Sequence, residues 1–447
     1  MHKIKNYIFD PNRLIFYKNG IDSNLKSKIN ILIEDNSRFE LLQQNLRDYN
    51  PSAVKSKGLL PSSGGICLTY NCQLRCNYCS FSSEEDSTLV LDEKDIELYT
   101  DYLIKNIYIK KLTTGKKSKL HVYFSGGGEP TYNWSLFTRA VNIIREKCNR
   151  NNVEYELELT TNGMLNDMQT GFIIDNFTGV MVSFDGIPII QNANRKTNKD
   201  KNTGKIVTQT INAFDKADIS LSIRTTLWQY DFKYMNDMAS YIYDNYKNFS
   251  QWSLMPILAT GRATDNLKDD YLSNIEYNFA RYYFNIIAMV EKNYGKNNIT
   301  SPLFSNQFSE IFCGQMNVES LWLMPGAKMI TCLESKEYSS VFAEIVDGKL
   351  KLNEEFKSPI LKKYIEKFSE CKDCIAYRFC RGGCPLKFLR DENTSIKSAD
   401  WECKMIKNYW KHIFENILDG KSYLGWSLKK ISIEELPNSE IYSLIKI

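Results

Sequence analysis

The cysteines constrain this chain more than any other feature of its sequence. Among 447 residues there are twelve cysteines but only three histidines. The first residues lead into no apolar signal core, so we expect a reducing, cytoplasmic compartment in which clustered thiols bind metal rather than form disulfides. Scarce histidine disfavours a histidine-ligated zinc enzyme and a histidine-based catalytic triad.

The composition excludes several classes of protein. Hydrophobic residues make up 43% and charged residues 25%, which is typical of a globular chain and not of a disordered or collagen-like one. A net charge of +4 is too small to indicate nucleic-acid binding. No apolar run approaches the roughly 18 residues of a membrane helix. We therefore expect neither nucleic acid nor membrane as a partner.

From residue 65 onward, apolar β-rich runs alternate with helix-like segments. The expected strands cover 66–70, 120–124, 155–160, 180–183, 219–226 and 252–258. The expected helices lie near 93–110, 134–148, 166–176, 205–217 and 233–246. This alternation predicts an α/β fold, and six such units predict a partial (β/α)6 barrel with its chemistry at the C-terminal strand ends.

We expect five parts in the chain. They are a small N-terminal α+β segment at 1–60, the barrel at 61–265, a helical bridge at 266–312, a cysteine-rich domain at 313–405 and a tail at 406–447. The first segment should hold strands at 13–17 and 29–33, a helix at 37–48 and then a linker with Pro61–Gly65. A long amphipathic helix is expected at 270–294, and the tail should start as a helix near 404 and end irregularly.

Three cysteines follow the first expected strand as C-x3-C-x2-C, namely Cys72, Cys76 and Cys79. Soft thiolates select zinc or iron–sulfur. Structural zinc takes four protein ligands, whereas three thiolates on a [4Fe–4S] cluster leave one iron open. A zinc knuckle that borrows a distant fourth cysteine is the alternative.

This motif, with the aromatic Tyr78 before its last cysteine, resembles that of the radical S-adenosylmethionine (SAM) enzymes. The resemblance implies a partial barrel and a cluster whose open iron binds the methionine part of SAM. It also implies that an electron cleaves SAM to yield a 5′-deoxyadenosyl radical.

Further segments at the strand ends resemble other motifs of that family. They are Ser125–Pro130 (GGEP-like), Thr160–Gly163 (TNG-like) and Ser183–Gly186 (SxDG-like). The resemblance implies a set of SAM contacts, namely Tyr78, Gly127, Gly128, Glu129, Asn162, Ser183, Arg195, Arg224 and Leu258. Glycines permit close backbone approach, and carboxylate and guanidinium groups suit the SAM ammonium and carboxylate. Gln191-Asn192 and Ser80 depart from the pattern, where relatives often have His-Asp and an aromatic residue.

A second array, C-x2-C-x5-C-x3-C, resembles the SPASM extension of peptide-modifying radical SAM enzymes. The resemblance implies two auxiliary [4Fe–4S] clusters, making three in all. Its outer cluster would be held by Cys371, Cys374, Cys380 and Cys403, and its inner cluster by Cys313, Cys332 and Cys384. A zinc ribbon is the alternative.

Two departures bear on the reaction. Residues 304–309 lack the further cysteine of fully ligated relatives, so we expect an open iron in the inner cluster that a substrate thiolate, another side chain or water would fill. In anaerobic sulfatase maturases an Asp that acts as catalytic base follows the cysteine matching Cys332. Here Leu333 and then Glu334 follow, so Glu334 is the candidate base and a sulfatase maturase is disfavoured.

The sequence therefore predicts an anaerobic radical SAM/SPASM enzyme that modifies a ribosomally synthesised precursor peptide, with flavodoxin or ferredoxin as electron donor. The expected product is an intrapeptide thioether or carbon–carbon crosslink. The alternatives are a formylglycine-generating sulfatase maturase and a zinc-stabilised binding protein without enzymatic activity. The basic segment 1–60 would either bind an acidic leader peptide by strand addition or cap the barrel. Cys67 is expected to be a core residue and Cys148 to be incidental.

Overall fold

The computed structural model describes most of the chain between residues 61 and 304 and shorter stretches on either side. The described ranges are 2–4, 7–10, 15–18, 61–83, 87–228, 231–257, 260–266, 269–296, 298–304, 320–335, 341–353, 371, 374–376, 380, 382–384, 386–388, 398–418, 426–431 and 441–446. The expected strand at 29–33, the expected helix at 37–48, Cys313 and Leu258 lie outside these residues.

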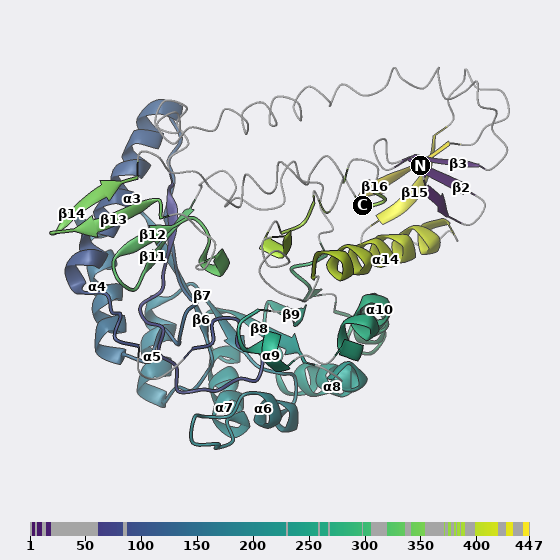
Figure 1. Cartoon of the computed structure of the whole chain (residues 1–447), viewed down its shortest axis with the longest axis horizontal. Coiled ribbons are helices and arrows are strands. Elements are labelled where there is room, and N and C mark those ends of the chain that lie inside the picture. Colours follow the sequence, from purple (N-terminus) through teal and green to yellow (C-terminus); the bar gives the residue numbers. More distant parts are fainter. Residues whose placement is uncertain are drawn as a thin grey trace.

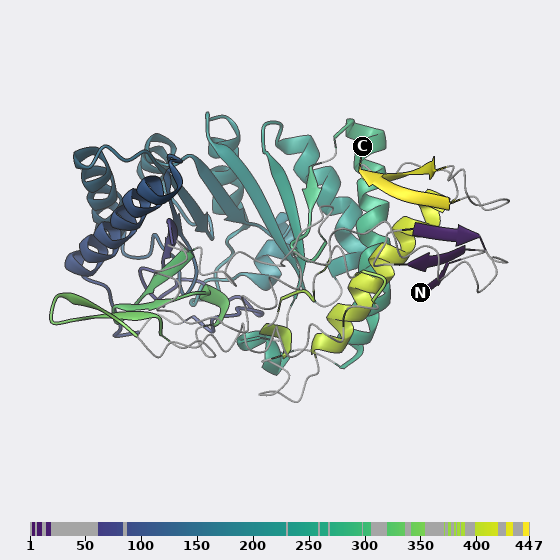
Figure 2. The ribbon, with the colours of Figure 1, turned by 90° about the horizontal axis from the view of Figure 1, so that it is seen from above.

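One curved sheet of eleven strands forms the centre of the molecule (Figures 1 and 2). Seven successive strands run parallel, namely β4 (Ser63–Ile66), β5 (Leu120–Phe124), β6 (Tyr155–Thr161), β7 (Gly179–Ser183), β8 (Ser220–Leu227), β9 (Gln251–Pro256) and β10 (Ile299–Thr300). The other edge is extended by β11 (Ser320–Met324), which is parallel to β4, and by the antiparallel strands β12 (Lys328–Ile330), β13 (Ala343–Val346) and β14 (Lys349–Leu352). The described strands do not close on themselves, so the predicted partial barrel is confirmed.

Helices connect the parallel strands and cover the convex face of the sheet (Figure 1). They are α3 (Glu93–Thr114), α4 (Trp134–Arg150), α5 (Asp167–Asn176), α6 (Pro188–Asn194), α7 (Gly204–Asp215) and α8 (Met235–Asn245), the last preceded by the 3-10 turn η3 (Asp231–Tyr234). Local sequence sets their ends: Asp92 and Asp95 form a capping box before α3, and Gly115 ends that helix in the left-handed conformation. All five predicted helices are present, and the short α6 was not predicted.

The first barrel strand lies earlier than predicted. It is β4, Ser63–Ile66, and not 66–70, so Gly64 and Gly65 belong to the sheet and not to a linker. Each glycine allows a close approach: a Cβ would overlap the Tyr99 side chain at Gly64 and the Trp322 ring at Gly65. The sequence analysis interpreted Gly64 and Gly65 as part of a linker, because glycine also favours turns. The side chains that require these glycines, Tyr99 and Trp322, lie far away in the sequence. Cys67 follows the strand and is fully buried in the core, as expected.

A second sheet brings the two ends of the chain together. Its order is β1 (His2–Ile4), β2 (Tyr7–Asp10), β3 (Ile15–Lys18), β16 (Ile441–Lys446) and β15 (Trp426–Ile431). The prediction that the tail ends irregularly was wrong, because β16 pairs antiparallel with β3 from the N-terminal segment. Strand pairing at this separation leaves no local signal in the sequence.

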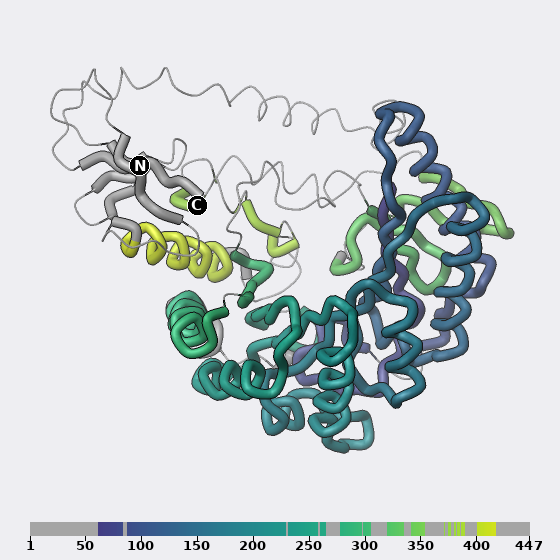
Figure 3. The backbone as a smooth tube through the Cα atoms, turned by 180° about the vertical axis from the view of Figure 1, so that it is seen from behind, coloured from purple at the N-terminus to yellow at the C-terminus, as the bar shows by residue number. Residues whose placement is uncertain are grey.

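Two long helices pack together between the barrel and this second sheet. They are α10 (Asp269–Tyr294), predicted at 270–294, and α14 (Ser398–Leu418), which begins before the predicted 404. Figure 3 shows them as neighbours, and the ring of Phe284 on α10 stacks on that of Tyr409 on α14, with 4.9 Å between the ring centres. Within the described residues, none of the helices has the length and apolarity needed to cross a membrane.

Candidate active site and cysteine clusters

The three cysteines of the first motif lie on the loop that leaves β4. The amide of Cys79 donates to the carbonyl of Cys76 (3.3 Å), and Cys72 Sγ accepts from the amide of Leu74 (3.4 Å). Asn162, which follows β6, donates from Nδ2 to Cys72 Sγ (3.7 Å). None of the three cysteines forms a disulfide. The structure therefore places the TNG-like segment beside the cysteine loop.

Arg262, at the start of α9 (Arg262–Asn266), holds this loop from the far side of the barrel. Its Nη1 donates to the carbonyl of Cys76 (2.7 Å). The preceding Gly261 has φ +54°, and a Cβ there would overlap the Cys79 carbonyl. Burial raises the pKa of Cys76 to about 11, while the charges of Arg195 and Arg262 act in the opposite direction. These cations favour the thiolate, which is the form that iron binds.

The glycine motif after β5 packs against the beginning of the cysteine loop. Gly126 and Gly127 have φ +79° and +67°, and the amide of Gly128 donates to the carbonyl of Thr69 (2.8 Å). A Cβ on Gly128 would overlap the carbonyl of Asn71. The motif is therefore more than a turn: it sets the distance between two loops that both carry proposed site residues.

Glu129 is buried and joins the second strand end to the third. Its Oε1 accepts from the amide and Oγ1 of Thr131 and from Oγ1 of Thr161, and its Oε2 accepts from the amide of Asn162 (2.7 Å). Burial raises the pKa of Glu129, and these hydrogen bonds oppose the rise. The sequence analysis expected a SAM contact here and missed these bonds to the β6 end.

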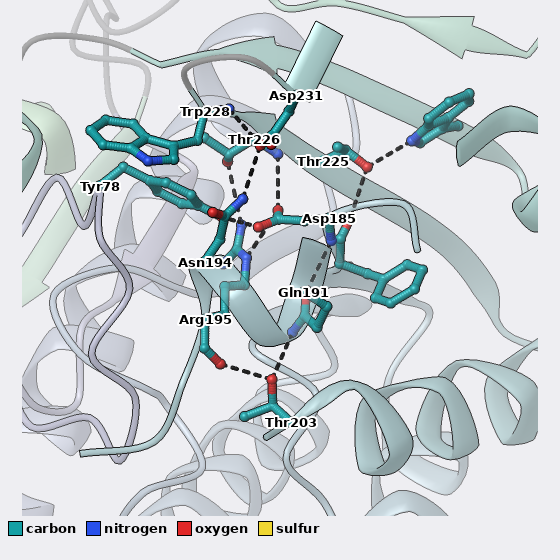
Figure 4. A network of polar contacts seen from close by, with 12 residues as sticks. Tyr78, Asp185, Gln191, Asn194, Arg195, Thr203, Thr225, Thr226, Trp228 and Asp231 are labelled. Carbon is teal, nitrogen blue, oxygen red and sulfur yellow. Dashed lines mark hydrogen bonds and ion pairs between the residues drawn. The ribbon is translucent and has the colours of Figure 1, made fainter. Parts of the chain in front are cut away.

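Asp185, fully buried after β7, organises the polar network in Figure 4. Its Oδ1 accepts from Arg195 Nε (3.1 Å), and its Oδ2 accepts from the hydroxyl of Tyr78. The guanidinium of Arg195 lies 5.1 Å over the Tyr78 ring and donates from Nη2 to Thr226 Oγ1 (3.3 Å). Arg195 and Tyr78, both predicted SAM contacts, are thus held by one carboxylate that was not in the predicted set.

The departure at residues 191 and 192 has a structural role. Gln191 accepts from the amide of Asp185 (3.0 Å) and donates to Oγ1 of Thr203 (3.3 Å). Asn192 Oδ1 accepts from the amides of Thr203 and Gly204, where α7 begins. These amide side chains therefore fix the segment that carries Arg195.

A second buried carboxylate, Asp231, was missed by the sequence analysis. Its Oδ2 accepts from Asn194 Nδ2 (2.9 Å) and from the amide of Trp228 (3.0 Å). Burial and then the charge of Asp185 raise the pKa of Asp231 to about 7. The ring of Trp228 lies 5.9 Å from that of Tyr78, so the two carboxylates belong to one region (Figure 4). An Asp at the start of a 3-10 turn gives no signal of burial in the sequence.

Two further predicted contacts, Ser183 and Arg224, lie on neighbouring strands of the barrel. Ser183 ends β7 and is paired in register with Arg224 on β8. Burial lowers the pKa of Arg224. The charge of Glu334 opposes this change and the charge of Arg195 adds to it, so both groups lie within electrostatic reach of Arg224. Glu334 is exposed in the 3-10 turn η5 (Leu333–Ser335). The candidate base therefore lies within electrostatic reach of a predicted SAM contact.

The four cysteines predicted for the outer auxiliary cluster gather at the N-terminal part of α14. The pKa of Cys380 is raised to about 12 by burial, and Cys403, Cys374 and Cys371 also raise it through their charge, so the four thiols are close together. Among the described residues no three His, Cys, Asp or Glu side chains converge on one metal ion. In a [4Fe–4S] cubane each thiolate binds a different iron atom, so the four sulfur atoms lie farther apart than the ligands of a single metal ion.

Comparison with known proteins agrees with this arrangement. Residues 66–240 match the family model described as the radical SAM superfamily. The chain is 22% identical over 375 residues to a cysteine-type anaerobic sulfatase-maturating enzyme of Clostridium perfringens, a match covering 80% of this chain and 96% of that protein.

Two solved structures share the fold. Native anSMEcpe with bound AdoMet and Cp18Cys peptide superimposes with a TM-score of 0.60 at 20% identity, covering 80% of this chain and 98% of that one. Streptococcus suis SuiB bound to precursor peptide SuiA superimposes with a TM-score of 0.52 at 15% identity, covering 84% of each chain. Residues 66–240 therefore form a radical SAM domain, and the chain is a radical SAM enzyme that uses SAM and an iron–sulfur cluster.

Proposed function

We propose that this radical SAM enzyme modifies a ribosomally synthesised peptide. The observation that carries the proposal is that four cysteines gather beside α14, in addition to the three cysteines on the loop after β4. The relatives support it: one is a sulfatase-maturating enzyme, and two solved neighbours hold peptides. The zinc-stabilised binding protein without enzymatic activity is not supported, because the chain is a radical SAM enzyme.

The donor set of the first motif fits a [4Fe–4S] cluster: three thiols on one loop, none in a disulfide, with Arg195 and Arg262 acting on the thiol of Cys76. Cys72, Cys76 and Cys79 would hold it. When bound, the cluster and SAM supply a 5′-deoxyadenosyl radical that removes a hydrogen atom from the substrate.

The polypeptide positions SAM through groups that it has already fixed. Arg195 donates from Nε to Asp185 and from Nη2 to Thr226, and its Nη1 would donate to the SAM carboxylate. Glu129 would place the backbone of Gly127 and Gly128 for the SAM ammonium, because its own oxygens accept four protein donors. Asn162, Ser183, Arg224, Tyr78 and Leu258 complete the proposed contact set.

We further propose two auxiliary clusters, the outer on Cys371, Cys374, Cys380 and Cys403 and the inner on Cys313, Cys332 and Cys384. Because residues 304–309 hold no further cysteine, the inner cluster would have an iron that binds a substrate thiolate. That arrangement favours a thioether crosslink over a carbon–carbon one. A natural substrate without cysteine would overturn this part of the proposal.

A formylglycine-generating reaction is the second candidate. The charge of Glu334 acts on Arg224, and a carboxylate in this position would accept a proton from a substrate Cys or Ser. Mass spectrometry of a sulfatase-derived peptide after turnover separates the two reactions, because only formylglycine formation converts the side chain to an aldehyde. We propose flavodoxin or ferredoxin as the electron donor, because the clusters need a low-potential reductant. We propose the cytoplasm as the compartment, because the cysteines must stay reduced to bind iron.

The main test is cluster content together with SAM cleavage. Anaerobically reconstituted protein should hold ~12 iron atoms per chain and should form 5′-deoxyadenosine under dithionite. Cys76→Ala should lose about a third of the iron and all SAM cleavage. Cys148→Ala, which removes a buried thiol of α4 that is not part of the three-cysteine motif, should retain both. SAM cleavage by Cys76→Ala would contradict the proposed site.

A further inference from the structure

A buried lysine lies within the second cysteine array. The side chain of Lys387 has no solvent exposure, and its Nζ donates to Cys403 Sγ (3.3 Å). Gly383, at φ +69°, makes room for it: a Cβ there would lie 2.9 Å from Lys387 Nζ and 3.4 Å from Cys380 Sγ. The ammonium also lies 5.1 Å from the ring centre of Phe388. The sequence analysis assigned this lysine no role.

The surroundings favour the charged form of this side chain. Burial opposes the charge, but Cys380, Cys403 and Glu402 raise the pKa of Lys387 above its ordinary value. In return, the charge of Lys387 acts on the thiols of Cys380 and Cys374 in the direction that favours thiolate. A buried ammonium is costly unless it is paired, and here its partners are mainly the predicted outer-cluster ligands.

We infer that Lys387 sets the reduction potential of the outer auxiliary cluster. The inference rests on the proposed ligand set Cys371, Cys374, Cys380 and Cys403. Adding one electron to a cluster makes it more negative by one charge, and a fixed cation in a low-dielectric site stabilises the reduced form. An N–H···S bond to a ligand sulfur acts in the same direction. Lys387 therefore makes this cluster a better electron acceptor than its thiolates alone would.

The neighbouring charges predict a pattern of signs. Glu402 is buried beside Lys387 and opposes its effect, so removing the carboxylate should move the potential upward. The charge of Lys407 acts on Cys374 more strongly than that of Lys387, but the Lys407 side chain is exposed on α14, where water and salt screen its charge. Lys407 is thus a matched control for Lys387.

The experiment is an EPR-monitored redox titration of the full-length, reconstituted enzyme, fitted with separate components for the clusters. Lys387→Met should lower the midpoint of one auxiliary component by at least ~59 mV, which is a tenfold change in its reduced fraction for a one-electron couple. Lys387→Arg should stay near the wild-type value, Glu402→Gln should move the same component upward, and Lys407→Gln should move it by less than half as much as Lys387→Met.

The outcomes separate this inference from the proposed function. Wild-type protein with ~4 iron atoms per chain would contradict the auxiliary clusters themselves. Full iron with no shift in Lys387→Met, or an equal shift in Lys387→Arg, would overturn the role of the charge. If Lys387→Met assembles no outer cluster, retention of that cluster in Lys387→Arg supports the inference. Loss of the cluster from both variants overturns it, because packing alone would then explain the lysine.

Discussion

At the scale of single residues, buried charges define the site. Asp185, Arg195 and Asp231 each have less than a tenth of their surface exposed, and each is partnered by groups from other parts of the chain. A buried ion pair contributes little net stability over apolar packing, but removing one partner strands the other charge. The network therefore fixes the position of Arg195 more than it stabilises the fold.

Asp185→Asn tests this pairing. The substitution leaves the buried guanidinium of Arg195 without its counter-charge, so the free energy of unfolding should fall by about 3–5 kcal/mol. Denaturant unfolding of the cluster-free protein measures it. The control is Asp200→Asn, which removes the partner of Lys196 at an exposed i,i+4 pair and should change stability by about 0.5 kcal/mol or less. Equal effects of both substitutions would contradict a buried pair.

Asp231 predicts a dependence of stability on pH. Its pKa of about 7 in the folded state, against 3.8 ordinarily, means that only the folded state keeps the proton between these values. Stability should therefore fall as pH rises from about 4 to about 7, by up to ~4 kcal/mol, and this contribution should be constant above that range. Asp231→Asn removes this slope. For the variant, the unfolding free energies at pH 5.5 and pH 8 should differ less than they do for wild type. An equal difference in the two proteins would refute the raised pKa of Asp231.

At the scale of elements, the position of β4 depends on two glycines. Gly64 lies against Tyr99, whose hydroxyl donates to the carbonyls of Gly65 (3.0 Å) and Leu321 (2.7 Å), and Gly65 lies under the Trp322 ring. The hydroxyl thereby bridges β4 to β11, where the sheet continues beyond the barrel. The cysteine loop starts directly after β4, so this packing also sets the position of Cys72, the first proposed cluster ligand.

Gly65→Ala should disturb this junction. The added methyl group overlaps Trp322, and overpacking of this kind costs about 1–3 kcal/mol or more. Gly171→Ala is the control, because a Cβ on this residue of α5 meets nothing within 4 Å and should stabilise the helix by ~1 kcal/mol. Thermal unfolding should show a lower melting temperature than wild type for Gly65→Ala and a higher one for Gly171→Ala. A stabilised Gly65→Ala would show that the close approach does not exist.

At the scale of the whole molecule, the chain ends form a sheet separate from the barrel sheet. In the register of β3 with β16, Phe16 lies opposite Tyr442 and Ile15 opposite Ser443. The strands come from segments predicted as two separate parts, 1–60 and 406–447. One sheet therefore ties the N-terminal segment to the helix α14 that carries Cys403 (Figure 1).

A disulfide tests this register. Phe16→Cys combined with Tyr442→Cys should form an intramolecular bond under mild oxidation, because directly opposite residues of antiparallel strands have Cα atoms within disulfide range. Peptide mapping by mass spectrometry detects the link. Phe16→Cys with Ser443→Cys should not form it efficiently, since neighbouring residues point to opposite faces. Equal yields would mean that the strands are not paired as described.

The sequence by itself determined the chemistry and the repeating elements. The spacing of Cys72, Cys76 and Cys79 and the alternation of apolar runs are local properties, and local backbone preferences express them directly. Only the tertiary structure decided which distant groups meet: Asp185 with Arg195 and Tyr78, Lys387 with Cys403, and β3 with β16. The physical reason is that a sequence shows which groups need a partner when buried, whereas burial and partnership depend on how elements far apart in the chain pack together.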